Sequence, residues 1–432
     1  MSDNSELRVE SFQVDQPRKN KSYLLTLLVY IGVSGCLAAI VSIPRAALNK
    51  ALGEAFYGIP RRSRFDTILD IIHTSVGTVA SLVWTRCISA PHRRLVVAQI
   101  GLTASTTWLA CQYSAWRPTS DWSAYVPHFL INCFGSVFLA DTSVHDLARR
   151  LHSDTRGLYV TQTWVKFVKL ISVAGTHMLL SLTPDVWHPK TTVAAAVISV
   201  VLLAFLIVQS IRGLFTEDQV EQPMSCDDAG GGPAGGVGGA RRELAACALA
   251  AAAVALFTGQ RAATKFTYYM YRDVLSFTDG HIRLIIGLQF MAFSASLAFS
   301  AHIQKLRPNS TPALLVSGIV IGVISRGMCI FVYPGTLPVG TATVLVYVSL
   351  VFSAFGPVPE PILRTEALGG WRAAALVQYA GLAMILADRG GSLLIEPTYY
   401  ALVTYVNANP FTLTVALLIL AYASNRISKK IK

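Results

Sequence analysis

Long apolar runs, separated by short polar stretches, make up most of the 432-residue chain. Many of these runs reach about 18 residues, the length at which a helix crosses roughly 30 Å of hydrocarbon. The pattern therefore predicts helices that span a membrane. The predicted spans cover residues 22–43, 66–84, 95–113, 125–143, 158–182 and 191–211, and then 244–268, 284–301, 312–332, 337–355, 372–387 and 399–423.

Some of the later spans are less regular than the first six. Arg261 and Lys265 interrupt the seventh, the eleventh is short, and the run from Asn407 to Pro410, with Asn409 inside it, breaks the twelfth. The glycine and prolines of "FGPVPEP" (355–361) are expected to stop or bend the tenth. The predicted fold class is all-α: a polytopic membrane helical bundle of about 12 (10–12) transmembrane helices in two six-helix halves.

A stretch of different composition, "TEDQVEQPMSCDDAGGGPAGGVGGARRE", lies between the halves. It is acidic at first and then rich in Gly, Ala and Pro, so it buries too little apolar area to fold. We expect a disordered cytoplasmic linker there. The predicted organisation is a cytoplasmic tail at 1–21, transmembrane halves at 22–211 and 243–424 with the linker at 212–242, and a basic tail at 425–432.

Composition supports a membrane protein, because 53% of the residues are hydrophobic and only 14% are charged. A soluble domain carries about 25% charged residues. The net charge is +12, but the basic residues do not cluster in one soluble domain. Nucleic acid is therefore not an expected partner. Lys and Arg fall mostly in short loops, where they set orientation. Their distribution places both termini in the cytoplasm, with the basic loop at 44–65 as the main exception.

The sequence contains no pattern typical of a soluble enzyme. It has no GxSxG elbow, Walker loop or HExxH helix, and the glycines at 230–239 lack the strand and helix of a phosphate-binding loop. The seven cysteines form neither a CxxC nor a Cys/His metal spacing. We therefore expect no enzyme activity, no metal and no cofactor.

Arg326 is the most deeply placed charge, in "LLVSGIVIGVISRGMCIFVY". An ionisable group at this depth faces a cavity, a partner helix or an interface. Arg326 therefore either binds an anion in a central cavity or forms a structural ion pair with another helix.

Asp66, Asp70 and His73 share one helical face in "FDTILDIIH". A carboxylate and an imidazole on one face could relay protons in a proton-coupled carrier. The alternative is that the two aspartates are hydrated at the outer end of the second span. Asp70 and His73 are the candidates for coupling.

Two further groups lie at the ends of predicted spans. Asp141 and Asp146, followed by Arg149 and Arg150, are interpreted as a cytoplasmic helix end whose charges pair with one another. Tyr268, in "FTYYMYRDV" (266–274), is expected either in an interfacial aromatic belt or in an aromatic cluster that faces a substrate.

Lys166 and Lys169, in "WVKFVKL" (164–170), interrupt the apolar fifth span. If that span begins near Trp164, both lysines can extend back to the headgroups. The stretch then marks a membrane edge. The alternative is a site for an anionic ligand, with Lys169 as the member of the pair that faces the cavity.

The six–loop–six layout resembles the major facilitator superfamily of secondary carriers. That family carries a basic motif between spans 2 and 3 and between spans 8 and 9, where this chain reads "WTRCISAPHRRL" (84–95) and "HIQKLRPNST" (302–311). Both loops are basic, but the motif's glycine and aspartate are absent. The resemblance implies a transporter scaffold.

A second resemblance is to the multi-spanning envelope membrane proteins of alphaherpesviruses. The stretches that suggest it include "FLADTSVHDLARRL" (138–151), the Ala-rich run "TTVAAAVISVVLLAFLIV" (191–208) and residues 84–118. It implies residence in the virion envelope and host-cell membranes, with no assigned chemistry.

Two functions follow from these observations. The first is a non-enzymatic envelope-type membrane protein on a transporter-like scaffold. The alternative is a secondary active transporter, with or without proton coupling, of a small and preferably anionic solute. The candidate pathway residues are Arg326, Asp70, His73, Lys169 and Tyr268. The lipid bilayer is the expected partner, with other membrane proteins and a small solute as further candidates.

The predicted orientation has a direct test in glycosylation. The two sequons, at Asn20 and Asn309, both lie on the predicted cytoplasmic side. We expect no glycan at either, measured as an unchanged gel mobility after endoglycosidase treatment of the chain synthesised with microsomes. A glycan on Asn309 would overturn this topology.

Overall fold

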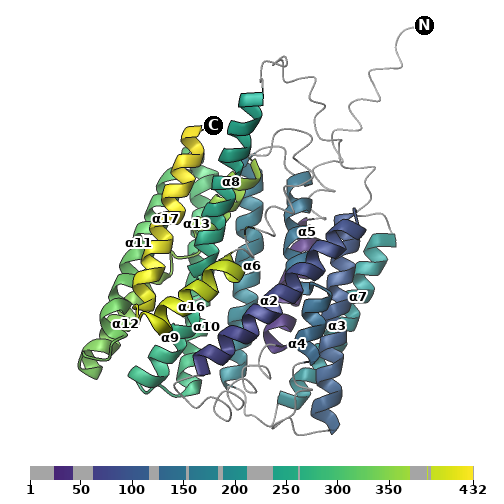
Figure 1. Ribbon diagram of the computed structural model, residues 1–432. Coiled ribbons are helices and arrows are strands. Elements are labelled where there is room, and N and C mark those ends of the chain that lie inside the picture. The colour runs from purple at the N-terminus through teal and green to yellow at the C-terminus, as the bar shows by residue number, and fades with distance from the viewer. Residues whose placement is uncertain are drawn as a thin grey trace.

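The computed structural model describes residues 24–41, 62–115, 126–151, 155–182, 188–211, 237–260, 263–369, 387 and 391–431. All regular structure in these ranges is helical. The helices stand side by side in a bundle (Figure 1), which confirms the predicted all-α polytopic fold. The predicted linker falls largely outside these ranges, as does the predicted eleventh span apart from Ala387.

The first half follows the predicted spans closely. It consists of the helix Leu24–Val41 and then α2 (Arg62–Cys87), α3 (Pro91–Ala115), α4 (Val126–Cys133), α5 (Ser136–Leu151), α6 (Thr155–Leu182) and α7 (His188–Ile211). The predicted fourth span is two helices, α4 and α5. They are separated at Gly135, whose φ of 60° lies in the left-handed region, where a residue without a Cβ is favoured.

The second half contains more breaks. Its elements are α8 (Val237–Gly259), α9 (Ala263–Tyr269), η7 (Met270–Val274), α10 (Asp279–Leu306), η8 (Pro308–Ser310), α11 (Thr311–Val332), α12 (Val339–Ser353), α13 (Pro359–Gly369), η9 (Gly391–Ile395), α16 (Glu396–Tyr405) and α17 (Pro410–Ile431). The break between α12 and α13 coincides with "FGPVPEP", as predicted for this proline-rich stretch. Helix α17 continues to Ile431, so that most of the predicted basic tail is helical.

The prediction of a single twelfth span over 399–423 is wrong. Helix α16 ends at Tyr405, Asn407 has a φ of 58°, and α17 begins at Pro410. The side chain of Asn409 stabilises this start, because its Oδ1 accepts a hydrogen bond from the Phe411 backbone N–H at 2.9 Å. Residues 399–405 therefore belong to the helix that precedes the last span.

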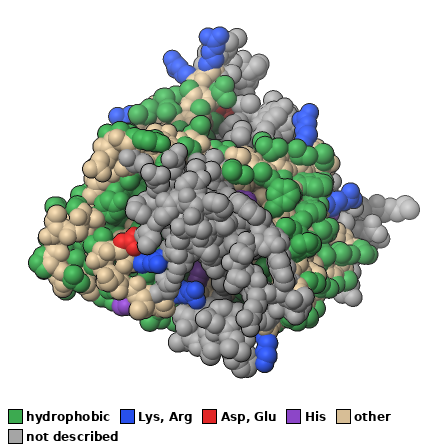
Figure 2. Space-filling view, turned by 60° about the horizontal axis from the view of Figure 1, so that its bottom comes forward, with side chains coloured by type: hydrophobic (Ala, Val, Ile, Leu, Met, Phe, Trp, Pro, Cys, Tyr) green, Lys and Arg blue, Asp and Glu red, His purple; other side chains and the backbone are tan. Residues whose placement is uncertain are grey.

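Six helices in the described part of the chain are long and apolar enough to cross a membrane by length and composition. They are Leu24–Val41, Lys190–Ile211, Arg241–Gly259, Gly280–Leu306, Thr311–Val332 and Pro410–Ile431. Large apolar side chains cover the flanks of the bundle (Figure 2). Helix α7, for example, exposes Val193, Val197, Val201 and Ile207. Such a surface suits lipid and not water.

The two halves meet along α6. In Figure 1 the purple and blue helices of the first half lie on one side and the green and yellow helices of the second half on the other. Helix α6 packs along α10 and also against α13, while α2 contacts α16. We call this contact surface the seam. The backbones approach closely there: a Cβ on Gly287 of α10 would lie 2.6 Å from the Met178 side chain of α6.

The break at Gly135 has a testable consequence. A Cβ at this position would lie 2.6 Å from Ser81 Oγ, and its φ disfavours any L side chain. Gly135→Ala should therefore destabilise the fold by about 2 kcal/mol, measured as a lower melting temperature in detergent. Gly175→Ala is the matched control, because a Cβ there meets nothing within 4 Å. A Gly135→Ala melting temperature equal to that of the control would contradict this account.

Candidate functional site

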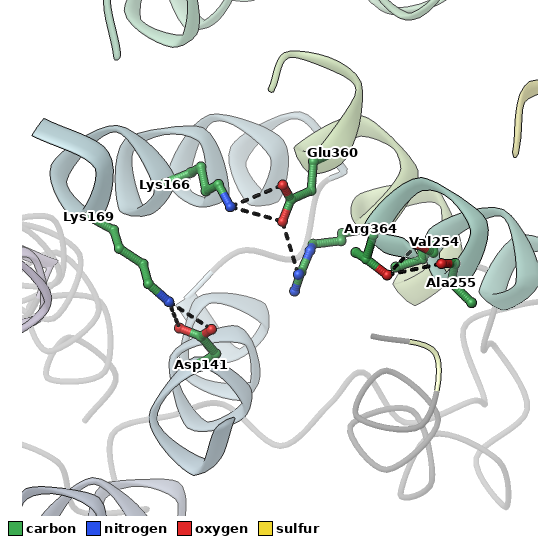
Figure 3. Close-up of polar contacts among 8 residues, drawn as sticks. Asp141, Lys166, Lys169, Val254, Ala255, Glu360 and Arg364 are labelled. Atoms are coloured by element: carbon green, nitrogen blue, oxygen red, sulfur yellow. Dashed lines mark hydrogen bonds and ion pairs between the residues drawn. The ribbon is translucent and has the colours of Figure 1, made fainter. Parts of the chain in front are cut away.

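The two lysines of "WVKFVKL" lie well inside α6. The helix begins at Thr155, more than two turns before Trp164, and Lys169 is at the middle of its 28 residues. Because a helix can extend beyond the hydrocarbon, these bounds do not place the membrane, and the membrane edge at this stretch stays a prediction. Both lysines bind acidic side chains of other helices instead of extending to headgroups (Figure 3).

Lys166 crosses the seam. Its Nζ lies 3.0 Å from each carboxylate oxygen of Glu360, the second residue of α13. Arg364, one turn later on α13, places its Nη2 3.0 Å from Glu360 Oε1. The exposed fractions of the three side chains are 21%, 8% and 8%. One buried carboxylate is therefore held between a cation from the first half and a cation from the second.

Lys169 pairs within the first half. Its Nζ donates to the two carboxylate oxygens of Asp141 on α5 at 2.8 and 2.9 Å. Asp146 binds Arg94 of α3, at 2.8 Å. The predicted pairing of these aspartates with Arg149 and Arg150 stays a prediction, because the side chains of both arginines lie outside the described part of the structure. We call Asp141, Lys166, Lys169, Glu360 and Arg364 the charged network.

A cavity of about 50 Å³ adjoins the Lys169–Asp141 pair. Tyr30 and Ser34 of the first helix contribute its other polar groups, and α3 contributes Ala98 and Leu102. A buried water needs about 10–15 Å³ of such volume, so the cavity has room for a few. Lys169 thus faces a cavity, which was the alternative considered for this residue.

Gln162 lies one turn before Lys166 on α6 and is 3% exposed. Within the described residues, neither its amide nitrogen nor its amide oxygen has a hydrogen-bond partner. Its neighbours on either side along the helix both contact the second half. Tyr159 donates to Ser300 of α10 at 3.3 Å and packs in a core cluster of the second half, and Lys166 binds Glu360.

Arg326 lies apart from the charged network. It is half-buried on α11, and within the described part of the chain it makes neither a hydrogen bond nor an ion pair. Its charge acts on Tyr271, Cys329 and Tyr399, which are residues of the second half. The predicted structural ion pair of Arg326 is therefore not found among the described residues.

The other predicted pathway residues are dispersed. His73 of α2 is buried, with its ring edge-on to that of His128 on α4 at 4.3 Å between centroids. Asp70 is also on α2, but its side chain lies outside the part that the structure describes. Tyr268 of α9 is half-buried against a core cluster of the second half and contacts the Tyr269 ring edge-on.

The network also contains two residues that the sequence analysis did not select, Glu360 and Arg364. A signal was present, because a Glu and an Arg four residues apart follow a proline at a helix start, where a carboxylate is favoured by the helix dipole. Among the described residues, no group of three His, Cys, Asp or Glu side chains could hold a metal ion.

Comparison with solved structures identifies the fold. The human organic anion transporter MFSD10 (TETRAN) superposes with a TM-score of 0.62 at 13% identity, covering 96% of this chain and 99% of that chain. A bacterial homologue of the iron transporter ferroportin gives 0.60 at 11% identity, covering 94% and 98%. The peptide transporter POT in complex with sulfate gives 0.61 at 14% identity, covering 95% and 94%.

These likenesses show that the chain has the same overall fold as these three transporters. No protein-family model matches the chain, and no curated protein matches it. The resemblance to alphaherpesvirus envelope proteins stays a prediction.

The ion pair between Lys166 and Glu360, which we call the seam pair, is expected to contribute more to stability than the pair between Lys429 and Glu366. Lys166→Met leaves a buried carboxylate with one cation fewer and should cost about 3 kcal/mol. Lys429→Met removes a pair in which the lysine is 40% exposed and Glu366 is 18% exposed, and it should cost less, about 1 kcal/mol. The melting temperatures of the purified variants in detergent measure the difference. Equal losses would show that the seam pair is no more important than a surface pair.

Proposed function

We propose that the protein is a secondary transporter that moves a small anionic solute by alternating access. The observation that carries this proposal is the charged network at the seam of a transporter-like fold. Lys166 and Arg364 belong to different halves, yet both hold the same carboxylate. In carriers of this architecture the solute site lies near the membrane midplane between the two halves, which rock about it.

The balance of charge in the network favours an anion. Among the described residues, it contains three basic and two acidic side chains. A buried cation is costly unless an anion pairs with it, so basic side chains at this seam suit an anionic solute. A human protein with the same fold is an organic anion transporter, which agrees with this choice of solute.

The roles of individual residues follow from their positions. Lys166 and Arg364 would contact the solute, and the Lys169–Asp141 pair with its cavity would form the adjoining wall. Arg326 remains a candidate for anion binding within the second half. Asp70 and His73 remain candidates for proton coupling, and Tyr268 a candidate for the cavity wall. None of these steps requires a catalytic group or a cofactor.

A second candidate function is that of a non-transporting membrane protein of the viral envelope and host membranes. One observation favours it: the acidic residues of the charged network are all engaged by bases, beside a cavity of only about 50 Å³. In that case the network would be a structural clamp between helices.

Flux measurements separate the two candidates. Proteoliposomes that contain the purified chain should take up radiolabelled benzoate or inorganic phosphate faster than empty liposomes do. Removing one charge-assisted contact, worth about 1.5–3 kcal/mol, should slow uptake about ten- to a hundredfold in Lys166→Met. Glu366→Gln, on the same helix as Glu360 but paired with the exposed Lys429, should keep the full rate. The absence of uptake of either anion by the unaltered chain would favour the envelope-type function.

A separate prediction concerns Arg326. If it binds the solute, Arg326→Ala should lose uptake while still being inserted in the membrane in normal amounts. Unchanged uptake in vesicles with equal amounts of protein would exclude Arg326 from the transport pathway, without affecting the proposed role of Lys166.

A further inference from the structure

We infer that the Glu360 carboxylate occupies the binding position of an external oxyanion, a carboxylate or a phosphate, and that such a ligand displaces it from Lys166 and Arg364. The inference deepens the proposed function, since the transported solute would be this ligand. It makes Glu360 an internal competitor of the ligand and not a contact for it.

The first support is the geometry of the two cations. Lys166 Nζ lies 3.0 Å from both Glu360 oxygens, and Arg364 Nη2 lies 3.0 Å from one of them. This is the arrangement in which a carboxylate or phosphate is bound through charge-assisted hydrogen bonds. Figure 3 shows the two side chains converging on the same carboxylate from α6 and from α13. Any ligand oxyanion at this point would meet a complete set of donors.

The second support is Gln162, one turn from Lys166 on the side of α6 that contacts the second half. It is 97% buried, and neither polar atom of its amide has a partner among the described residues. Leaving such a group unsatisfied is unfavourable. Glu360 binds both cations but leaves the Gln162 amide without a partner among the described residues, so this amide suits a larger occupant. A ligand that carries a polar group beside its oxyanion would satisfy both Lys166 and Gln162.

The third support is the place of Glu360 in the chain. Turns at 354–358 separate α12 from α13, and Glu360 follows them directly at the start of α13. Glu360 therefore belongs to the first turn of α13 and not to α12. Replacing one carboxylate by another at the two cations keeps their charge neutralised, and the displaced Glu360 must then reach water or take up a proton. A ligand held by both Lys166 and Arg364 would still join α6 to α13. Without ligand, Glu360 keeps the halves together.

The test is rescue of stability by an added anion. Glu360→Gln removes the internal carboxylate and leaves both cations, so the purified variant should melt at a lower temperature than the unaltered chain. Sodium acetate, benzoate or phosphate should restore the melting temperature, relative to sodium chloride at equal ionic strength. If Glu360 fills the position about nine-tenths of the time, its removal should tighten the apparent binding of the anion about tenfold.

The control is Glu366→Gln, which removes a carboxylate from the same helix whose partner is the exposed Lys429 and not a cation of the charged network. Its melting temperature should respond to the anions no more than that of the unaltered chain. Should Glu360→Gln fail to fold, Glu360→Asp retains the charge, shortens the side chain by one methylene and should show a smaller rescue of the same kind. No anion-specific rescue in the variant that folds, or equal rescue in Glu366→Gln, would overturn the inference.

Two further arms separate the possible sources of the oxyanion. In nanodiscs of neutral phosphatidylcholine, rescue by soluble benzoate or phosphate identifies a free solute. Rescue that requires phosphatidylserine in the nanodisc, with no effect of the soluble anions, identifies a lipid headgroup and overturns the assignment of a solute. Rescue in vesicles that show no uptake would retain the binding site and reject transport, whereas uptake without rescue would retain transport and reject this site.

Discussion

Charge burial inside the bundle is the constraint on which the rest of the structure depends. An isolated ammonium or carboxylate in a low-dielectric interior is so costly that it must be paired or neutralised. The two lysines of α6 meet this requirement with acids from different directions, one from α5 and one from α13. The positions of these helices around α6 are therefore set by charge as well as by apolar packing. The apolar contacts of α6 with α10 then hold the halves along the remainder of the seam.

Most of the fold could be predicted because hydrophobic length reports membrane crossing directly. The break of the tenth span at "FGPVPEP" and the irregularity near Asn407 could also be foreseen, because proline and positive-φ residues interrupt helices through local chemistry. The bounds of the last span could not be placed, because hydropathy marks the break at Asn407 but does not show that the last span begins only after it, at Pro410.

The site was predicted less well, because ion pairs join residues that are distant in the sequence. Lys169 and Asp141 are separated by 28 positions, and Lys166 and Glu360 by 194. The depth of a charge can be estimated from a single apolar run, and Arg326 was selected on this basis. The partner of a charge depends on how the helices pack, which a single run does not show. Both lysines were assigned to headgroups, with a cavity beside Lys169 as the alternative, whereas the structure pairs each of them with an acid of another helix. Glu360 and Arg364 are four residues apart, which is compatible with an ion pair on one helix. The sequence analysis interpreted this stretch only through its prolines, as a stop or bend.

The unbroken course of α6 has a consequence for how this chain can vary. Asp141 and Glu360 each follow an interruption, at Gly135 and at 354–358, whereas both lysines stand on one continuous helix. An insertion of one residue in α6 ahead of Lys166 would turn both lysines by about 100° and separate them from both acids together. The same insertion in the turns at 354–358 would be absorbed locally. Variation in length should therefore be tolerated in the segments that carry the acids and excluded from the helix that carries the bases.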